Sequence, residues 1–396
     1  MLPDHCQKIL QQLPSHRLLA LDVLRGLTIT AMILVNNPGS WSYLFWPLKH
    51  ADWHGLTPTD LIFPFFIFIV GMSITLSVNA MQAKGVSKQQ ILKSGALRTV
   101  KLIALGWFLA LFYYNFRDTN FSWLEQRLFS IRVMGVLQRI GLVYIIALAC
   151  YLYLKPKHIA LTLAALLIGY GALMQYMPYT LLNGETTSGQ WLYGNNLSAW
   201  LDNLLLGAQH VYYGNAEPLP FDPEGLLSTL PAIATALSGV LCSCYLSTEK
   251  NLHSQIKTLL WVATASIICG YSLSQVIPIN KALWTPSYVM ISSGLALLSY
   301  AFCSYILDIR RARLWCAPFL VFGANAILFF MFAGVVARIL IMIPVGETSL
   351  KGVIFSKALQ PLLGNYMGSF AFSVLFLLLS YAVMYACYKR RIFWKV

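Results

Sequence analysis

Long apolar stretches, each about the length of a membrane-spanning helix, recur along the chain and alternate with short polar segments. A helix needs about 20 apolar residues to cross the hydrocarbon core of a bilayer. These stretches are too long and too continuously apolar for barrel strands, so helices must satisfy the backbone in lipid. We therefore predict an all-α polytopic membrane protein with about ten transmembrane helices. The predicted spans are residues 18–37, 58–81, 96–115, 133–154, 158–177, 226–246, 256–277, 284–307, 317–341 and 367–388.

The longest connection between predicted spans is residues 178–225, which are rich in Gly, Asn, Pro and aromatic residues. This connection is long enough for a small surface subdomain or a lid. No linker, low-complexity tract or obvious repeat divides the chain. We therefore treat residues 1–396 as a single transmembrane domain with one long outer connection.

Composition narrows the class of protein further. Of the 396 residues, 58% are hydrophobic and only 11% are charged, whereas soluble domains carry about 25% charged residues. This argues against a soluble enzyme, a disordered protein and a nucleic-acid binder, although the formal net charge is +14. The eight cysteines form neither a disulfide framework nor a zinc pattern. The spacing of His50, Asp52 and His54 is not a known metal signal, and we expect no metal.

The distribution of charge predicts the orientation of the chain in the membrane. Lys and Arg residues outside the spans concentrate on the side that holds both termini, so both termini are predicted to be cytoplasmic. Most Asp and Glu residues fall on the opposite side. The simplest interpretation is the positive-inside rule together with attraction to anionic membrane lipid. The alternative is that an outer substrate is cationic and an inner one anionic.

The densest polar cluster lies between the first two predicted spans, from Asn36 to Asp60. His50 is a candidate proton-transfer group, because imidazole titrates near neutral pH. The sequence Thr57-Pro58-Thr59-Asp60 is typical of a helix start, with Thr as the N-cap and an acid at the third position. Asp60 is therefore either a helix cap or a functional carboxylate at the lip of an apolar helix.

Charged residues also fall inside predicted spans, where a charge costs at least about 2.5 kcal/mol on insertion scales. Asp22 and Arg25 share a face of the first span, as a structural ion pair or as functional groups. Arg132 and Arg139 are two turns apart at the fourth span and are predicted to share a helix face. They are either a snorkelling and an ion-paired residue or a guanidinium ladder for an anionic ligand such as a phosphate.

Two further sets of polar residues stand at or within spans. Asn325 is an amide inside the ninth predicted span and needs a hydrogen-bonding partner. Asp222 and Glu224 precede the sixth span, where Asp222 fits the N-cap position before Pro223. These two carboxylates are either capping groups or the partners that an ammonium substrate needs.

Six segments spread over nearly the whole chain resemble the heparan-α-glucosaminide N-acetyltransferase family, including its bacterial transmembrane amino-sugar acetyltransferases. The LDxLRG element alone is weak evidence, but the KHADWxGLTxxDLxFPxFxF block is specific, and RxxGVLQR and DPEG add to it. The segments are 17–36 (RLLALDVLRGLTITAMILVN), 49–71 (KHADWHGLTPTDLIFPFFIFIVG), 132–144 (RVMGVLQRIGLVY), 221–228 (FDPEGLLS), 283–288 (LWTPSY) and 322–330 (FGANAILFF).

The resemblance implies a transfer of acetyl from cytoplasmic acetyl-CoA across the membrane to the amine of a terminal glucosamine. His50 matches the active histidine of the family, Asn36 its asparagine at the end of the first core helix, and Asp60 the acid of GLTxxD. The resemblance also implies an amino-sugar acceptor and a homodimer. Animal lysosomal members carry an additional amino-terminal region and span, whereas this match starts near the beginning of the chain. We therefore expect a protein of a bacterial inner (plasma) membrane.

Within this hypothesis His50 is either the general base or a transient acetyl carrier, Asp60 orients it, and Asn36 donates to the oxyanion. The candidate cofactor-binding residues are Arg132, Arg139 and Asn325, and the candidate substrate-binding residues are Asp222, Glu224 and Trp53. A proton-coupled sugar transporter would also explain intramembrane charges and interrupted helices. An O-acyltransferase of a surface polysaccharide is the rival enzyme.

Overall fold

The computed structural model describes residues 2–11 and 18–394. Within these residues nine helices are long and apolar enough to cross a membrane, and a bent helix pair makes up to ten. This confirms the predicted all-α polytopic fold, and the chain is an integral membrane protein. The nine single spans contain α2 (Leu19–Asn36), α3 (Ile62–Gln82), α4 (Lys88–Leu111), α5 (Val136–Tyr153), α6 (Pro156–Tyr176), α8 (Thr229–Thr248), α9 (Leu252–Leu273), α10 (Pro286–Ser304) and α14 (Gln360–Lys389).

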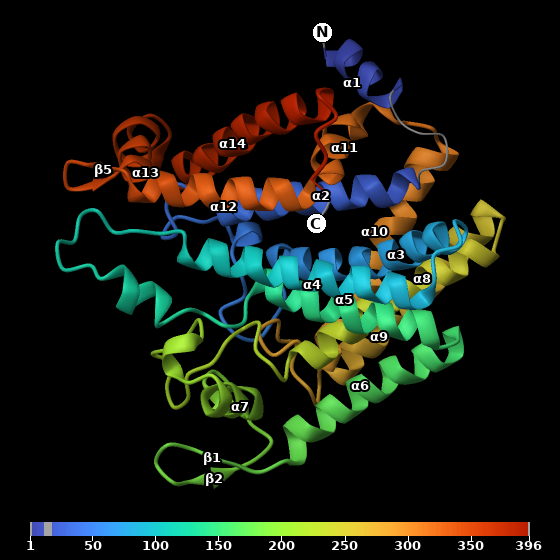
Figure 1. The fold of residues 1–396 in the computed structure, drawn as a ribbon, viewed down its shortest axis with the longest axis horizontal. Helices are drawn as coiled ribbons and strands as arrows, with labels where there is room; N and C mark the ends of the chain where they lie inside the picture. Colours follow the sequence, from blue (N-terminus) through green and yellow to red (C-terminus); the bar gives the residue numbers. More distant parts are fainter. Residues whose placement is uncertain (1, 12–17, 395–396) are drawn as a thin grey trace.

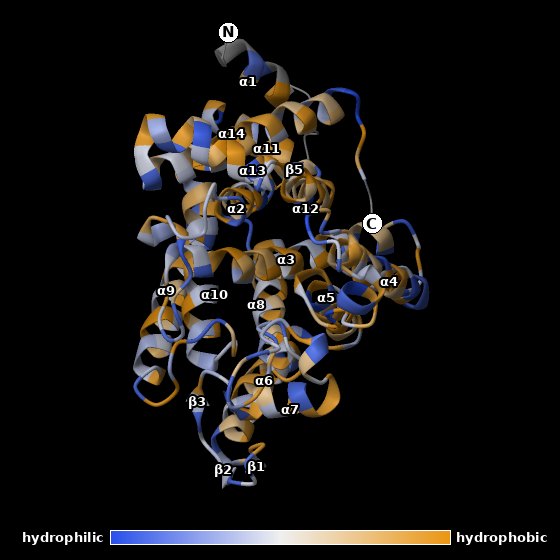
Figure 2. Ribbon diagram, turned by 90° about the vertical axis from the view of Figure 1, so that its left-hand side faces the viewer, coloured by the Kyte–Doolittle hydropathy of each residue, from blue (hydrophilic) through white to orange (hydrophobic). Residues whose placement is uncertain are grey.

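The helices run roughly side by side and enclose two large apolar cores (Figure 1). One core joins α2, α3 and α10 to α11 (Ala317–Ala324) and α14, and the other joins α3 to α4, α5 and α8. Small residues bring α3 and α8 into close contact, as is common between membrane helices. A Cβ atom on Gly71 would lie 1.9 Å from the carbonyl oxygen of Ala236, and one on Gly239 would lie 2.0 Å from that of Phe68. Apolar residues predominate along these helices (Figure 2).

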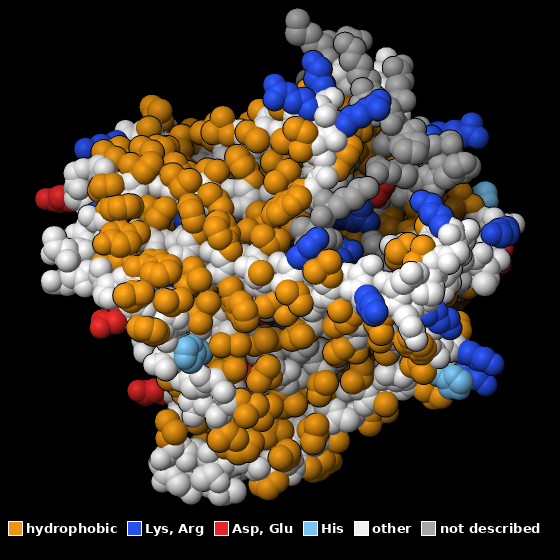
Figure 3. Space-filling model, viewed as in Figure 1, with side chains coloured by type: hydrophobic (Ala, Val, Ile, Leu, Met, Phe, Trp, Pro, Cys, Tyr) orange, Lys and Arg blue, Asp and Glu red, His pale blue; other side chains and the backbone are white. Residues whose placement is uncertain are grey.

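The connecting segments form two ends of the bundle that differ in charge. We call one end the acidic face, which comprises segments 37–61, 112–135, 177–228, 274–285 and 343–359. We call the other end the basic face, which comprises segments 83–87, 154–155, 249–251, 310–316 and 390–394. Most Lys and Arg side chains visible in Figure 3 lie toward one end of the molecule, acidic side chains lie mainly toward the other, and an apolar band separates them.

The connection predicted at 178–225 folds into short elements on the acidic face. Two hairpins, β1 (Tyr179–Thr180) with β2 (Thr186–Thr187) and β3 (Trp191–Leu192) with β4 (Asn195–Asn196), precede α7 (Leu197–Leu205). A small apolar cluster holds these elements against the end of α6 and against the 274–285 segment. This arrangement fixes the segment over the end of the bundle, where it forms one wall of the site described below.

The ninth predicted span is not one straight helix. It breaks at Asn325 into α11 and α12 (Ala326–Met342), which are bent by 74° to each other. Asn325 leaves the helical conformation, with φ −129° and ψ 41°. Hydropathy measures only how apolar a stretch is, so it did not reveal this break.

The remaining described elements are short and lie mainly in the connections. They are α1 (Leu2–Gln11), η1 (Trp46–Leu48), η2 (Pro58–Leu61), η3 (Leu124–Leu128), η4 (Ala208–His210), η5 (Tyr305–Ile309), η6 (Leu314–Cys316), β5 (Pro344–Val345), β6 (Thr348–Ser349), α13 (Leu350–Val353) and η7 (Ile354–Leu359).

Candidate active site

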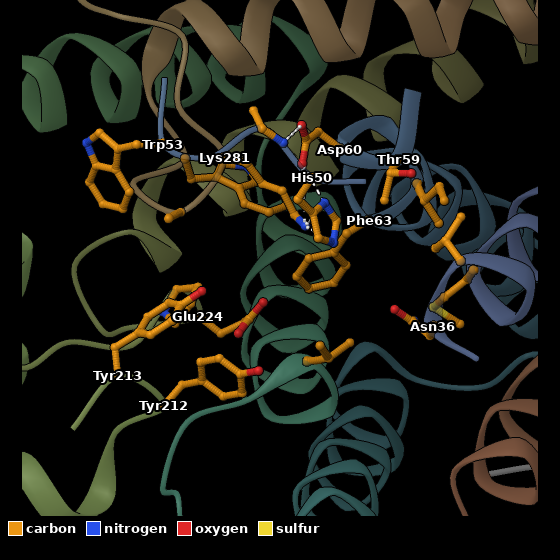
Figure 4. A pocket seen from close by; sticks show the side chains of 18 of the residues that line it. Asn36, His50, Trp53, Thr59, Asp60, Phe63, Tyr212, Tyr213, Glu224 and Lys281 are labelled. Carbon is orange, nitrogen blue, oxygen red and sulfur yellow. Dashed lines mark hydrogen bonds and ion pairs between the residues drawn. The ribbon is translucent and has the colours of Figure 1, made fainter. Parts of the chain in front are cut away.

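A cavity of about 360 Å³ opens among the segments of the acidic face. It brings together residues that are far apart in sequence, and Figure 4 shows His50 and Lys281 side by side, with Asn36 and Trp53 on opposite sides of the view. Six of the residues predicted from the sequence line this cavity: Asn36, His50, Trp53, Asp60, Arg132 and Glu224.

His50 and Asp60 form the central pair of the cavity. Nδ1 of His50 lies 2.6 Å from Oδ1 of Asp60. The His50 side chain is 47% exposed to the cavity, whereas that of Asp60 is 1% exposed. Asp60 therefore holds the imidazole through Nδ1, and Nε2, which has Lys281 as a neighbour at 3.2 Å, is the ring nitrogen that a ligand in the cavity would meet.

The same carboxylate also caps a helix, as the Thr57-Pro58-Thr59-Asp60 pattern predicted. Oδ2 of Asp60 accepts hydrogen bonds from the backbone of Ala51 at 3.1 Å and of Thr57 at 3.0 Å. Thr57 and Asp60 form a reciprocal capping box at the start of η2, with Pro58 in its first turn. Because the two oxygens serve different partners, the helix start holds the Asp60 carboxylate in place for His50.

Lys281 is the second charged neighbour of His50. Its Nζ lies 3.1 Å from Nδ1 and 3.2 Å from Nε2 of His50, and 3.8 Å from Oδ1 of Asp60. Asn280 places it there, because the Asn280 amide donates to the carbonyl of Trp53 at 2.9 Å. Burial lowers the pKa of Lys281, and the carboxylates of Asp60 and Glu224 oppose that effect only in part.

Asn36 and Trp53 lie on other parts of the cavity wall. Asn36 is the last residue of α2 and is exposed toward the cavity. Trp53 is half-buried, and its Nε1 donates to the carbonyl of Trp191 at 2.8 Å. Its ring lies edge-to-face with Tyr193 and Phe221, at centroid distances of 5.2 and 5.6 Å. With Tyr212 and Tyr213 this makes an aromatic wall above the catalytic candidates.

Arg132 links the cavity wall to the 221–228 segment through carboxylates. Its guanidinium donates to both oxygens of Asp222 at 2.7 and 2.6 Å, and it also pairs with Glu224. Burial alone would raise the pKa of Glu224, but Arg132, Arg139 and Lys281 outweigh burial and lower it. Asp222, a predicted substrate-binding residue, is 2% exposed and does not line the cavity, whereas Glu224 does.

Arg139 lies elsewhere than the sequence pattern suggested. The expectation that Arg132 and Arg139 share a helix face is wrong, because α5 begins at Val136 and Arg132 lies in the preceding segment. Arg139 is 0% exposed and lines neither this cavity nor the second cavity described below. It donates to the carbonyl of Gly225 at 3.1 Å and to Ser228, so it joins α5 to the start of α8.

Asp202 of α7 holds the 221–228 segment from the outer side. Its two oxygens accept from the backbone of Leu226 at 2.9 Å and of Asp222 at 3.2 Å. Burial raises the pKa of Asp202 to about 7. Gly225 is needed at this contact, because a Cβ atom there would lie 2.0 Å from Asp202.

A second cavity of about 440 Å³ adjoins the first on the side of the basic face. Its polar lining includes Arg25, Ser73, Arg98 and Asn325. Arg25 donates to Asp22 at 3.0 Å and to Ser73 at 2.8 Å. The guanidinium of Arg98 lies 4.6 Å from the centroid of the Tyr144 ring, and its buried Nε has no hydrogen-bonding partner among the described residues.

The two cavities share part of their walls. The four side chains that line both are Met32, Phe63, Val136 and Phe330. All four are apolar, so the boundary between the cavities carries no charge. A flexible, elongated ligand that displaced them would reach from the basic face to His50.

Sequence reasoning missed several residues of these two cavities. Lys281 is not among the residues singled out from the sequence, although a lone lysine shortly before a Trp-Thr-Pro helix start on an acidic face is a usable signal. Tyr193, Tyr212 and Tyr213 lie in the long connection, where no periodic pattern marks them. Arg98 is not among those residues either, because its position inside the bundle depends on how α4 packs on α5.

Comparison with known proteins identifies the family to which the chain belongs. A human and a mouse protein, each named heparan-alpha-glucosaminide N-acetyltransferase, are 30% identical over 359 residues and 29% identical over 361 residues, respectively. Each alignment covers 80% of this chain but only 52% of the human and 53% of the mouse protein. The family model described as heparan-alpha-glucosaminide N-acetyltransferase, catalytic, matches residues 17–274, which hold the His50–Asp60 pair. The chain therefore belongs to the heparan-α-glucosaminide N-acetyltransferase family.

Proposed function

We propose that this protein transfers an acetyl group across the membrane, from acetyl-CoA at the basic face to the amine of a glucosamine-type sugar at the acidic face. One observation carries the proposal: the His50–Asp60 pair lies in an acidic-face cavity whose apolar wall is shared with a cation-lined cavity on the other side. The names of the human and mouse relatives, which this chain matches over about half of their length, support the same chemistry.

The second cavity has the features that an acyl-CoA needs. CoA carries phosphates at one end and an uncharged pantetheine arm at the other. Arg25 and Arg98 supply guanidinium groups, which bind phosphate well. The apolar boundary of Met32, Phe63, Val136 and Phe330 suits the arm. We therefore assign the phosphates to Arg25 and Arg98, which line this cavity, and not to Arg132 and Arg139, which do not.

The first cavity suits an amino sugar. Aromatic rings such as Trp53 and Tyr193 offer the flat apolar surfaces on which sugar rings pack. Glu224 supplies a carboxylate for an ammonium or hydroxyl group. Asp222 acts behind it, by holding Arg132 in place.

The catalytic step follows from what surrounds His50. A protonated amine cannot attack a thioester, so the sugar ammonium first releases one proton to water. As the neutral amine then bonds to the acetyl carbon, Nε2 of His50 takes a second proton from the sugar nitrogen. Asp60 holds Nδ1 and stabilises the imidazolium that forms. Asn36 and the ammonium of Lys281 lie at the same cavity and stabilise the negative charge that develops on the acetyl oxygen. His50 then returns the proton to the sulfur as the carbon–sulfur bond breaks.

Direct transfer is the simpler course in this geometry. Because the two cavities share a wall and His50 lines the first, donor and acceptor can meet in the first cavity and no acetyl-histidine carrier is required. The charge distribution further supports cytoplasmic termini, with the acidic face outside a bacterial inner membrane. A homodimer in anionic lipid remains part of the proposal on the strength of family membership.

Purified protein in liposomes, given acetyl-CoA and glucosamine, tests the function. We expect N-acetylglucosamine from the wild type and none from a folded His50→Ala variant. Movement of unmodified glucosamine without acetyl-CoA would instead identify a transporter. Acetylation of a hydroxyl group, with N-acetylglucosamine accepted as a substrate, would identify an O-acyltransferase.

A further inference from the structure

The chain reverses direction where α14 ends and returns into the bundle (Figure 1). The backbone N–H of Arg391 donates to the carbonyl of Tyr388 at 3.0 Å, and that of Ile392 donates to the carbonyl of Cys387 at 2.9 Å. Arg391 adopts φ 57°, a left-handed conformation in which glycine is the usual residue. These are the bonds of a Schellman helix end, which directs the chain sharply away from the helix axis. We call residues 390–394 the strap.

Asn325 fastens the strap to the broken span. Its Nδ2 donates to the carbonyl of Ile392 at 2.8 Å, and its Oδ1 accepts from the backbone N–H of Trp394 at 3.1 Å. The nitrogen and the oxygen of the Asn325 side-chain amide thus bind the backbone on both sides of Phe393, as a neighbouring strand would. Asn325 is 2% exposed and sits at the 74° break between α11 and α12. The break therefore provides the side chain that anchors the strap.

The anchored strap places Trp394 on the wall of the second cavity. Trp394 lines this cavity together with Arg25, Arg98 and Asn325, and 43% of its surface is exposed. The strap also carries Arg390 and Arg391, which add positive charge near the same end of the bundle. An indole face beside guanidinium groups can stack on a purine base while the cations pair with phosphates.

We propose that the strap forms the nucleotide subsite of the second cavity, in which Trp394 stacks on the adenine ring of CoA and Asn325 positions Trp394. This inference rests on the proposed use of acetyl-CoA and adds where its nucleotide end is held. Asn325 acts through the strap and is a positioning residue.

Equilibrium binding to the purified full-length protein in detergent tests the subsite with two probes. CoA contains the adenine nucleotide, whereas 4′-phosphopantetheine contains only the arm and one phosphate. Trp394→Ala should weaken CoA binding by about tenfold or more, the size of one lost base stack. It should leave 4′-phosphopantetheine binding unchanged, and Trp394→Phe should restore most of the CoA affinity.

Matched control variants distinguish a selective loss of CoA binding from a loss caused by misfolding of the protein. Trp315→Ala removes another tryptophan of the basic face, 39% exposed and outside the cavity lining, and should bind both probes like the wild type. Asn325→Ala should show the same CoA-selective loss while Trp394 is still present. Equal losses for the two probes, or CoA binding by Trp394→Ala as tight as or tighter than that of the wild type, would overturn the subsite. Absence of CoA binding by the wild type would instead overturn the proposed function itself.

Discussion

Oδ1 of Asp60 lies 2.6 Å from Nδ1 of His50, while the other oxygen of the same carboxylate closes a helix-capping box with Thr57. A local folding signal and a catalytic arrangement thus use one side chain. The cap fixes the rotamer of Asp60, and this rotamer fixes the orientation of the imidazole. The orientation of His50 is therefore built into the start of η2.

The substitution Asp60→Asn tests whether the pairing of Asp60 with His50 is needed for turnover. The amide can still fill the site, but it no longer stabilises the imidazolium, so we expect kcat to fall by about 10²–10⁴-fold. Steady-state acetylation of glucosamine measures the loss, and thermal melting checks that the variant is folded. Asp52→Asn is the control, because Asp52 also lines the cavity but pairs with Lys49 at 2.6 Å. Wild-type kcat in Asp60→Asn would show that the pair has no role in turnover.

Because the pKa of Lys281 is lowered, we expect the protein to lose activity at high pH. Its ammonium is required in the proposed step, and burial lowers its pKa from the usual 10.5. Activity should therefore fall as pH rises through that lowered pKa, because the neutral amine cannot stabilise the developing negative charge. Lys281→Arg keeps its charge and should extend activity to higher pH, whereas Lys281→Met should lower kcat at every pH at which the wild-type lysine is protonated. Identical pH profiles for wild type and Lys281→Arg would exclude titration of Lys281 as the cause.

We expect the substitution Arg132→Gln to lower the stability of the protein markedly. Arg132→Gln leaves the carboxylate of Asp222, which is 2% exposed, without its bidentate partner. Removing one partner of a buried ion pair costs about 3–5 kcal/mol. Thermal melting in detergent should show a marked fall, and adding Asp222→Asn should recover part of it. Glu224→Gln should affect melting less and should mainly raise KM for the sugar. A double variant no better than Arg132→Gln would argue against the pairing.

Because the pKa of Asp202 is raised in the folded protein, we expect the stability of the protein to fall as pH rises. Its pKa of about 7 in the folded protein lies above the usual aspartate value of 3.8. The protonated form is therefore favoured by folding, and this stabilisation is full below the unfolded pKa and lost as pH rises through about 7. The melting temperature of the wild type should decline between about pH 5 and pH 8, and the decline should be smaller in Asp202→Asn. Parallel melting curves for the two proteins over that range would contradict the assignment.

Direct transfer predicts that no acetyl-enzyme accumulates. With labelled acetyl-CoA and no acceptor, rapidly quenched wild-type protein should carry no label, and the label should appear only in the sugar once glucosamine is added. Label on wild type that is absent from His50→Ala would establish a histidine carrier and overturn direct transfer.

Much of the fold follows from local features of the sequence. Apolar runs long enough to cross a bilayer place most span ends to within about four residues, because backbone exposed to lipid must be helical. The exceptions are α4 and α14, which begin at Lys88 and Gln360, before the predicted starts at 96 and 367. The Thr57–Asp60 helix start was also readable, because a capping box involves only residues three apart. The candidate residues His50, Asp60 and Asn36 came from the family resemblance together with this local pattern.

The tertiary structure alone decided which of the polar residues meet. His50 and Lys281 are 231 residues apart, and Asn325 and Trp394 are 69 apart, so no periodicity links either pair. Arg132 and Arg139 show the opposite case, since their spacing suggested one helix face but α5 begins only after Arg132. Hydropathy reports which stretches prefer lipid, whereas these contacts depend on how the helices and loops pack together. The sequence therefore determined the membrane architecture and the chemical candidates, and packing determined the two adjoining cavities in which those candidates act.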